Sequence, residues 1–128
     1  MTSIEIGLLP SKDPALRLGD IIENGKWAQS YTQGLDQYTF ESDPLTYAAV
    51  ERFLSRISEA AVKLGDLAEV LIPGHPWRRI RAIGNSLRHE YDEISEEIVW
   101  NVVKNDLPSL VIACEEALAR LGIEPSAK

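Results

Sequence analysis

The chain has 128 residues, which is enough for one domain and too few for two of ordinary size. Apolar residues make up 45% of it, so a hydrophobic core can form, and 13 basic against 20 acidic residues give a net charge of −7. That charge argues against a broad basic face for coating nucleic acid, although it allows a small basic cleft on an acidic body. A single cysteine, Cys114, excludes a disulfide framework and a Cys-rich zinc site, and two histidines leave little for a metal centre.

The two ends of the chain look like loose termini around one domain. We expect a single domain over residues 1–128, with loose ends at about 1–13 and 123–128. The N-terminus lacks a basic start followed by an apolar stretch, and no apolar run approaches the roughly 20 residues of a membrane span. The sequence therefore predicts a cytoplasmic protein that has no contact with a membrane.

The first predicted helix runs from about Pro14 to about Tyr38. Apolar residues recur there at spacings of three and four, and Gly34 either ends the helix or bends it. Residues 37–42 are expected to be a connection.

A second helix begins at the Ser-Asp-Pro sequence of residues 42–44, where a capping side chain is followed by a proline suited to the first turn. Its apolar stripe extends from Val50 to Leu71, and the Pro-Gly pair at 73–74 ends it. A third helix opens with Pro76 in its first turn and continues to about Tyr91 or Asp92.

Ser95 and the two glutamates after it predict the start of a fourth helix. Pro108 marks a kink or a restart, and Gly122 ends the last helix. No segment shows the sustained alternation of apolar and polar residues that is typical of a strand. The predicted fold is therefore an all-α, up-and-down bundle of four to five helices.

The third helix carries the side chains that suggest chemistry. On a helical projection its apolar residues gather on one side, and a polar set gathers on another: Arg81, Asn85, Arg88, His89 and Asp92. These groups suit phosphodiester cleavage without a metal. A neutral histidine can take the proton of a ribose 2′-OH, or a protonated one can supply a proton to the leaving 5′-oxygen. An arginine can bind the phosphate, and an amide side chain can orient the histidine or the arginine.

Each of these residues also has a simpler interpretation. A polar helix face is usually just solvated, and Arg81 could pair with Asp92 or Glu90 on the surface. Tyr91 could be a core tyrosine with its hydroxyl at the surface. Arg78 and Arg79 form, with Arg81, the densest basic cluster, which could bind RNA or a protein partner or could simply be solvated.

Other aromatic and sulfur-containing residues are expected to pack. Trp77 and Trp100 are expected to pack against other side chains, and Cys114 is expected to lie in the core. Trp27 is expected to be partly exposed at an interface.

The run Gly-Asn-Ser-Leu-Arg-His-Glu-Tyr-Asp at residues 84–92 resembles the HepT-like branch of the HEPN superfamily. The resemblance extends over most of the chain, through residues 20–23, 56–61, 76–80, 98–100 and 105–110. It implies a small helical bundle that forms a homodimer and acts as a metal-independent ribonuclease toxin of a type II or type VII toxin–antitoxin system. The implied substrate is RNA. No cofactor and no metal are expected.

The usual partner in this family is a minimal nucleotidyltransferase, the MNT antitoxin, which can form a larger hetero-oligomer with the toxin and transfer AMP to a motif tyrosine. The family motif is an arginine, four to six residues, a histidine, any residue and a tyrosine. His89 corresponds to the catalytic histidine, Tyr91 to the modified tyrosine, and Asn85 to the polar residue that follows the arginine. The cleft is expected where the motif helices of two subunits meet.

The motif arginine is displaced in this chain. The three positions that the spacing allows hold Gly84, Ile83 and Ala82. Either Arg88 or Arg81 takes over the phosphate contact, with a slight preference for Arg88 because it borders His89. If neither does, the protein is a weak or inactive subunit that binds the nucleotidyltransferase. Gly84 itself suggests a close approach of two helices, which we expect in a dimer interface.

Overall fold

The computed structural model describes residues 13–88 and 95–122, and nearly all of them are helical. The elements, in chain order, are α2 (Pro14–Thr32), α3 (Gln37–Glu41), α4 (Pro44–Leu64), α5 (Leu67–Leu71), α6 (Trp77–Arg88), α7 (Glu96–Asn101), the π-helical turn η1 (Val102–Asp106) and α8 (Leu107–Arg120). These two ranges contain no strand. Within them, no helix combines the length and the apolar character needed to cross a membrane.

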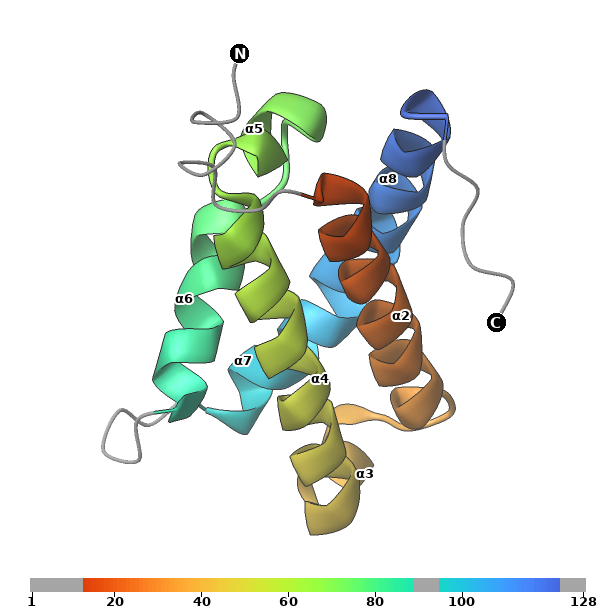
Figure 1. The fold of residues 1–128 in the computed structure, drawn as a ribbon. Coiled ribbons are helices and arrows are strands. Elements are labelled where there is room, and N and C mark those ends of the chain that lie inside the picture. The colour runs from red at the N-terminus through yellow and green to blue at the C-terminus, as the bar shows by residue number, and fades with distance from the viewer. Residues whose placement is uncertain (1–12, 89–94, 123–128) are drawn as a thin grey trace.

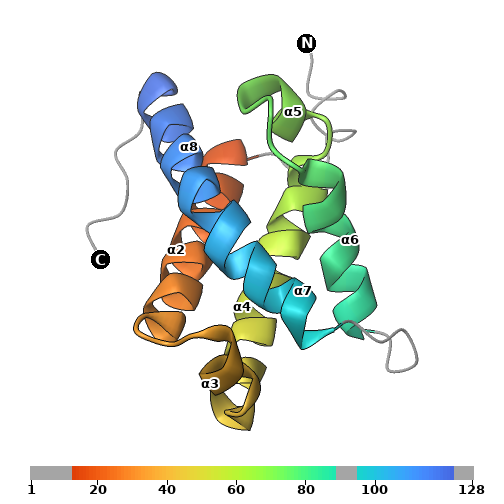
Figure 2. The same cartoon turned by 180° about the vertical axis from the view of Figure 1, so that it is seen from behind.

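Helix α4 lies in the middle of the bundle. Helix α2 packs along one side of it and α6 along the other, while α8 packs against α2 (Figure 1). Seen from behind, α7, η1 and α8 form an almost continuous diagonal across the bundle (Figure 2). The predicted all-α bundle is therefore confirmed, with α2, α4, α6 and α8 as the longer helices of the described part of the chain.

Three predicted helix starts are confirmed, two of them by a capping side chain. Asp43 accepts a hydrogen bond from the backbone N–H of Thr46 at 3.2 Å, with Pro44 in the first turn of α4. Ser95 accepts a hydrogen bond from the N–H of Ile98 at 3.1 Å and begins α7. Pro108 lies in the first turn of α8, directly after η1, so the predicted restart at this proline is also correct.

The first helix is shorter than predicted. Helix α2 ends at Thr32, and Gly34 turns the chain with a φ of +81°, which only glycine adopts without strain. The segment expected to be a connection contains the short helix α3. Its start is a capping box, in which the Asp36 side chain and Thr39 bond each other's backbone N–H groups. Of the two roles predicted for Gly34, the end of the helix is correct, whereas the predicted continuation to about Tyr38 is wrong although the apolar spacing continues across the break.

The second helix is also interrupted. Helix α4 ends at Leu64 because Gly65 takes a φ of +60°, and α5 follows as a separate short helix. The third helix is described as far as Arg88, so its predicted end at Tyr91 or Asp92 lies outside the described residues. Gly122 follows α8 with a φ of +78°, as expected for a residue that ends a helix.

The residues predicted to pack do so. Trp77 is 1% exposed, and its indole N–H donates to the Ile72 carbonyl at 2.8 Å. Trp100 is half-buried, with its ring 5.3 Å from that of Phe40. Cys114 is fully buried, and burial raises the pKa of its thiol to about 12. The interpretation of this cysteine as a core residue is confirmed.

Helix α6 meets α4 at one very close contact. The Ser58 hydroxyl of α4 donates to the Arg81 carbonyl at 2.8 Å and accepts from the N–H of Gly84 at 3.2 Å. A Cβ atom at position 84 would lie 2.6 Å from Ser58 Cβ and closer still to its hydroxyl. The close approach expected of Gly84 thus occurs within the chain, against α4, and does not require a second subunit.

This contact makes position 84 intolerant of any side chain. We expect Gly84→Ala to lower the free energy of unfolding by about 1–3 kcal/mol, because the added methyl group must push α6 away from α4. Gly19→Ala is the matched control: Gly19 also lies inside a helix, but a Cβ there would meet nothing within 4 Å. The control should be neutral or stabilising by up to about 1 kcal/mol. Urea unfolding of both variants measures the difference, and equal effects would contradict the close contact.

Candidate functional site

Helix α6 has one buried face and one exposed face. Trp77, Ile80, Ile83 and Gly84 are buried, as expected of the side that packs on α4. The exposed residues along the helix are Arg78, Arg79, Ala82, Asn85 and Arg88. The predicted separation into a packing face and a polar face is correct for this part of the helix.

His89, the predicted catalytic residue, and Tyr91, the predicted modification site, lie outside the described residues. The description of α6 ends at Arg88, and α7 begins at Glu96. Arg88 is therefore the described residue that directly precedes the motif histidine in the chain.

Arg81 is fully engaged within the chain. Its guanidinium forms a two-pronged ion pair with Glu69 of α5, at 2.6 and 3.0 Å. It also donates to the carbonyls of Gly65 at 3.0 Å and Ala61 at 3.4 Å, at the end of α4. These bonds hold the pKa of the Glu69 carboxyl below its ordinary value and raise that of Arg81. To hold a phosphate, this guanidinium would have to leave Glu69.

Arg88 is arranged differently. It is exposed at the end of α6, and within the described ranges its guanidinium forms no ion pair and donates no hydrogen bond. Its side chain extends back along the helix: the Nη1 atom is 3.5 Å from the point where a Cβ on Gly84 would be. Position 84 is one of the three positions that the family motif allows for its arginine. The guanidinium of Arg88 thus lies beside Gly84, at the contact where the Ser58 side chain excludes a larger residue.

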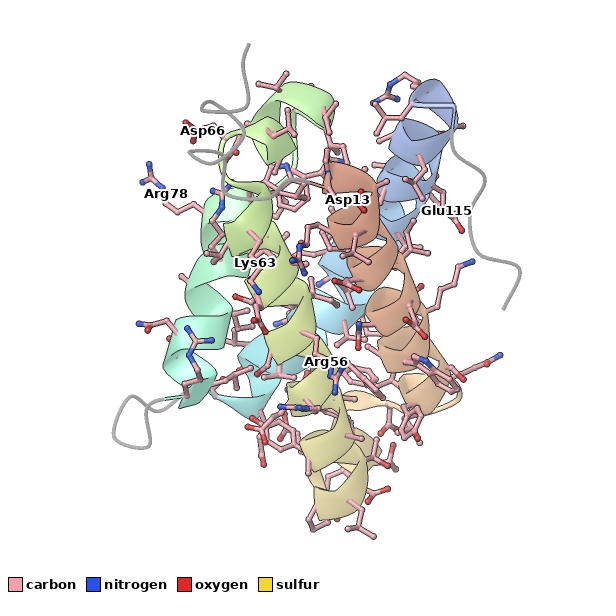
Figure 3. The ribbon with its side chains drawn as sticks, viewed as in Figure 1. Asp13, Arg56, Lys63, Asp66, Arg78 and Glu115 are labelled. Atoms are coloured by element: carbon pink, nitrogen blue, oxygen red, sulfur yellow. The ribbon has the colours of Figure 1, made fainter. Side chains whose placement is uncertain are left out.

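The remaining predicted residues of α6 have separate surroundings. Arg79 forms an ion pair with Asp106 of η1 at 2.9 Å, which connects the start of α6 to the far side of the bundle. Arg78 and Asn85 are exposed and without a hydrogen-bonding partner among the described residues. Figure 3 shows Arg78 extending away from the bundle at the start of α6. The three arginines of the predicted basic cluster do not form one patch of unpaired positive charge, because Arg79 and Arg81 each form an ion pair with a carboxylate.

Sequence reasoning did not single out Glu51, a half-buried carboxyl group of α4. Burial raises its pKa, and the nearby carboxylate of Glu96 raises it further. Burial and these two carboxylates also raise the pKa of Tyr47 to about 12. Glu96 begins α7 shortly after the segment that contains His89 and Tyr91, so this acidic cluster lies near one end of that segment. Tyr47 and Glu51 are four residues apart in the sequence, and this spacing could have predicted that their side chains are neighbours on one face of the helix.

The described part of the site can hold an anion. Among the described residues Arg88 has no acidic partner, and the exposed amide of Asn85, four positions before His89 in the sequence, makes no hydrogen bond to them. A guanidinium offers a phosphate two parallel donors. The described end of α6 therefore carries a guanidinium and an amide, two groups that can donate hydrogen bonds to a phosphate, and His89 follows them in the sequence.

Comparisons with known proteins show the family of the chain. The family model described as "Ribonuclease HepT-like" matches residues 21–117. A relative from Methanocaldococcus jannaschii, described by name as an RNase candidate, is 33% identical over 110 residues, which cover 86% of this chain and 91% of the relative. A probable ribonuclease HepT from Thermococcus cleftensis is 32% identical over 93 residues, covering 73% of this chain and 84% of the relative.

A second relative from Methanocaldococcus jannaschii, also described as an RNase candidate, is 28% identical over 102 residues, covering 80% of this chain and 94% of the relative. No solved structure matches the chain significantly. The family match spans most of the chain and includes α6 with the motif segment that follows it. The chain therefore belongs to the HepT-like ribonuclease family.

Proposed function

We propose that the protein is the ribonuclease toxin of a HepT/MNT toxin–antitoxin system, and that it cleaves RNA without a metal. His89 carries the proton in this proposal, and Arg88 binds the phosphate. The observation that supports it most directly is the position of Arg88. This guanidinium precedes His89, has no acidic partner among the described residues, and lies beside Gly84, where the motif arginine could otherwise stand.

The proposed reaction uses the 2′-OH of the RNA as the nucleophile. The 2′-oxygen attacks the adjacent phosphorus, its proton passes to a neutral His89, and the bond to the 5′-oxygen breaks. The leaving 5′-oxygen takes a proton, either from water or from the protonated His89 of a second subunit. Arg88 stabilises the charge that develops on the phosphate oxygens, and Asn85 orients the phosphate. The products are a 2′,3′-cyclic phosphate and a free 5′-OH. DNA lacks the nucleophile and is not cut.

The active form in this proposal is a homodimer, in which two motif helices border one cleft. The proposed antitoxin, an MNT nucleotidyltransferase, transfers AMP from ATP to the Tyr91 hydroxyl. A phosphorus–oxygen bond forms at the tyrosine, and pyrophosphate leaves. The added phosphate places a negative charge and a bulky nucleotide where RNA must bind, which blocks the cleft.

The first test of this function is RNA cleavage by the purified chain in excess EDTA. We expect cleavage by the wild type, and a loss of about 10²- to 10⁴-fold in His89→Ala. Mapping of the ends should find cyclic phosphates. If neither protein cuts RNA and the intact mass shows Tyr91 unmodified, the chain is better described as an inactive subunit that binds the nucleotidyltransferase.

The second test separates the two arginines. Arg88→Ala should lower kcat by about 10²- to 10³-fold with an unchanged melting temperature, and Arg88→Lys should restore part of the activity. Arg81→Ala should lower the melting temperature, and Glu69→Ala should reproduce that effect because both remove the same ion pair. If Arg81→Ala abolishes cleavage while Glu69→Ala leaves it intact, Arg81 is the phosphate contact and the assignment to Arg88 is wrong.

The third test addresses regulation. Incubation with ATP and a nucleotidyltransferase encoded beside this chain should add one AMP to the wild type, measured by intact mass, and none to Tyr91→Phe. The modified wild type should lose cleavage. Tyr91→Phe should keep cleaving after the same treatment, unless the antitoxin inhibits by covering the cleft. AMP attached to another residue would contradict the assignment of Tyr91.

A further inference from the structure

Three aromatic rings form an exposed cluster on the face shared by α2 and α4. Trp27 and Tyr31 of α2 are 49% and 46% exposed, and Phe53 of α4 is half-buried between them. The Trp27 and Phe53 rings are stacked, with centroids 6.4 Å apart and an interplanar angle of 18°. Tyr31 meets Phe53 edge-on, with centroids 5.2 Å apart. The rings hold one another in place, so the exposed ring faces are fixed in advance.

Two arginines accompany this aromatic cluster. Arg52 and Arg56 flank Phe53 in the sequence, are exposed, and lie one turn apart on α4. Figure 3 shows Arg56 standing out from α4 on the side that faces α2. Within the part of the chain that the structure describes, neither guanidinium has an ion pair or a hydrogen bond. Arg78 and Arg88 of α6 share this property, whereas Lys26, Lys63, Arg79 and Arg81 each pair with a carboxylate.

Exposed ring faces next to unpaired guanidinium groups match the two repeating parts of a nucleic-acid strand. Unpaired bases stack on aromatic rings, and phosphates bind arginine. A duplex hides its base faces, so the match is to a single strand. Phe53 and Arg56 are three residues apart on α4, which places a ring and a charge next to each other on one helix face.

We propose that the cluster of Trp27, Tyr31, Phe53, Arg52 and Arg56 is a binding surface for single-stranded RNA, separate from the cleavage site at the end of α6. Bases stack on the exposed rings, and Arg52 and Arg56 hold the adjoining phosphates. The surface reads no sequence, because every base has a face that can stack. This inference rests on the proposed function, in which RNA is the substrate. It adds that the RNA bound at this surface is single-stranded.

The test is equilibrium binding of a fluorescein-labelled, fully 2′-O-methylated RNA strand of about a dozen nucleotides, a length within the usual range for such surfaces. This probe cannot be cleaved, since its 2′-oxygens carry no proton. Trp27→Ala should weaken binding roughly tenfold and leave its salt dependence unchanged. Arg56→Ala should weaken binding and reduce the slope of log K against log salt by about 0.7, the share of one phosphate on a single strand. Arg52→Ala should act in the same way.

Controls keep the result specific. Ile112→Ala removes a side chain on α8 that is 56% exposed, and it should bind as the wild type does. A single-stranded DNA of the same length should compete with the probe, and a duplex should not. Binding by Trp27→Ala and Arg56→Ala equal to that of the wild type would overturn the proposal. So would a loss of binding that follows dissociation of a dimer in sedimentation, because the surface would then be an interface between copies.

The same proteins distinguish this proposal from the proposed function. If the wild type cuts RNA while the surface variants bind the methylated probe normally, only the binding surface is wrong. If the wild type and His89→Ala both bind the probe through Trp27 and neither cuts RNA, the binding surface stands and the ribonuclease assignment fails.

Discussion

The close contact between Ser58 and Gly84 determines where the functional helix lies. Helix α6 packs along α4, and at this point only a serine hydroxyl separates the two backbones. The Ser58 hydroxyl forms two hydrogen bonds with the backbone of α6: it donates to the Arg81 carbonyl and accepts from the Gly84 N–H. A side chain at position 84 would separate the helices. The position of the exposed face of α6 depends on this contact.

The same constraint explains the displaced arginine. A chain that uses position 84 for helix packing cannot also place a guanidinium there. Arg88 comes one turn later on the same helix, and its side chain returns to within 3.5 Å of the missing Cβ position. Arg81 holds the end of α4 and the start of α5 against α6 through Glu69 and two carbonyls. Arg81 therefore serves packing, while Arg88 of the same helix has no acidic partner among the described residues and is the arginine to which we assign the proposed phosphate contact.

The sequence predicted the features that depend on local chemistry. The caps at Asp43 and Ser95, the restart at Pro108 and the packing of Trp77 and Cys114 follow from the properties of those side chains, and the structure has them. The breaks at Gly34 and Gly65 could not be read with certainty, because an apolar stripe continues across each of them. The partners of Arg81 could not be predicted either, since Glu69 lies 12 residues away on another element. For the same reason the sequence suggested Asp92 or Glu90 as its surface partner.

The candidate site was predicted from one helix and a family resemblance, and the cluster on α2 and α4 was not predicted at all. Trp27 was expected to be partly exposed, but its contact with Phe53 joins residues from two helices and requires the packed bundle. The net charge of −7 gave no indication of that surface, because it says nothing of where Arg52 and Arg56 lie or of their lack of an acidic partner among the described residues.

We propose that Arg88 takes the place of the motif arginine, because Gly84 is used for helix packing. A crystal structure of His89→Ala bound to an uncleavable RNA strand would show which arginine contacts the phosphate. We expect the guanidinium of Arg88 within hydrogen-bonding distance of the scissile phosphate, with Arg81 still paired with Glu69. A phosphate held by Arg81 with the Glu69 pair broken, or one held by neither arginine, would contradict it.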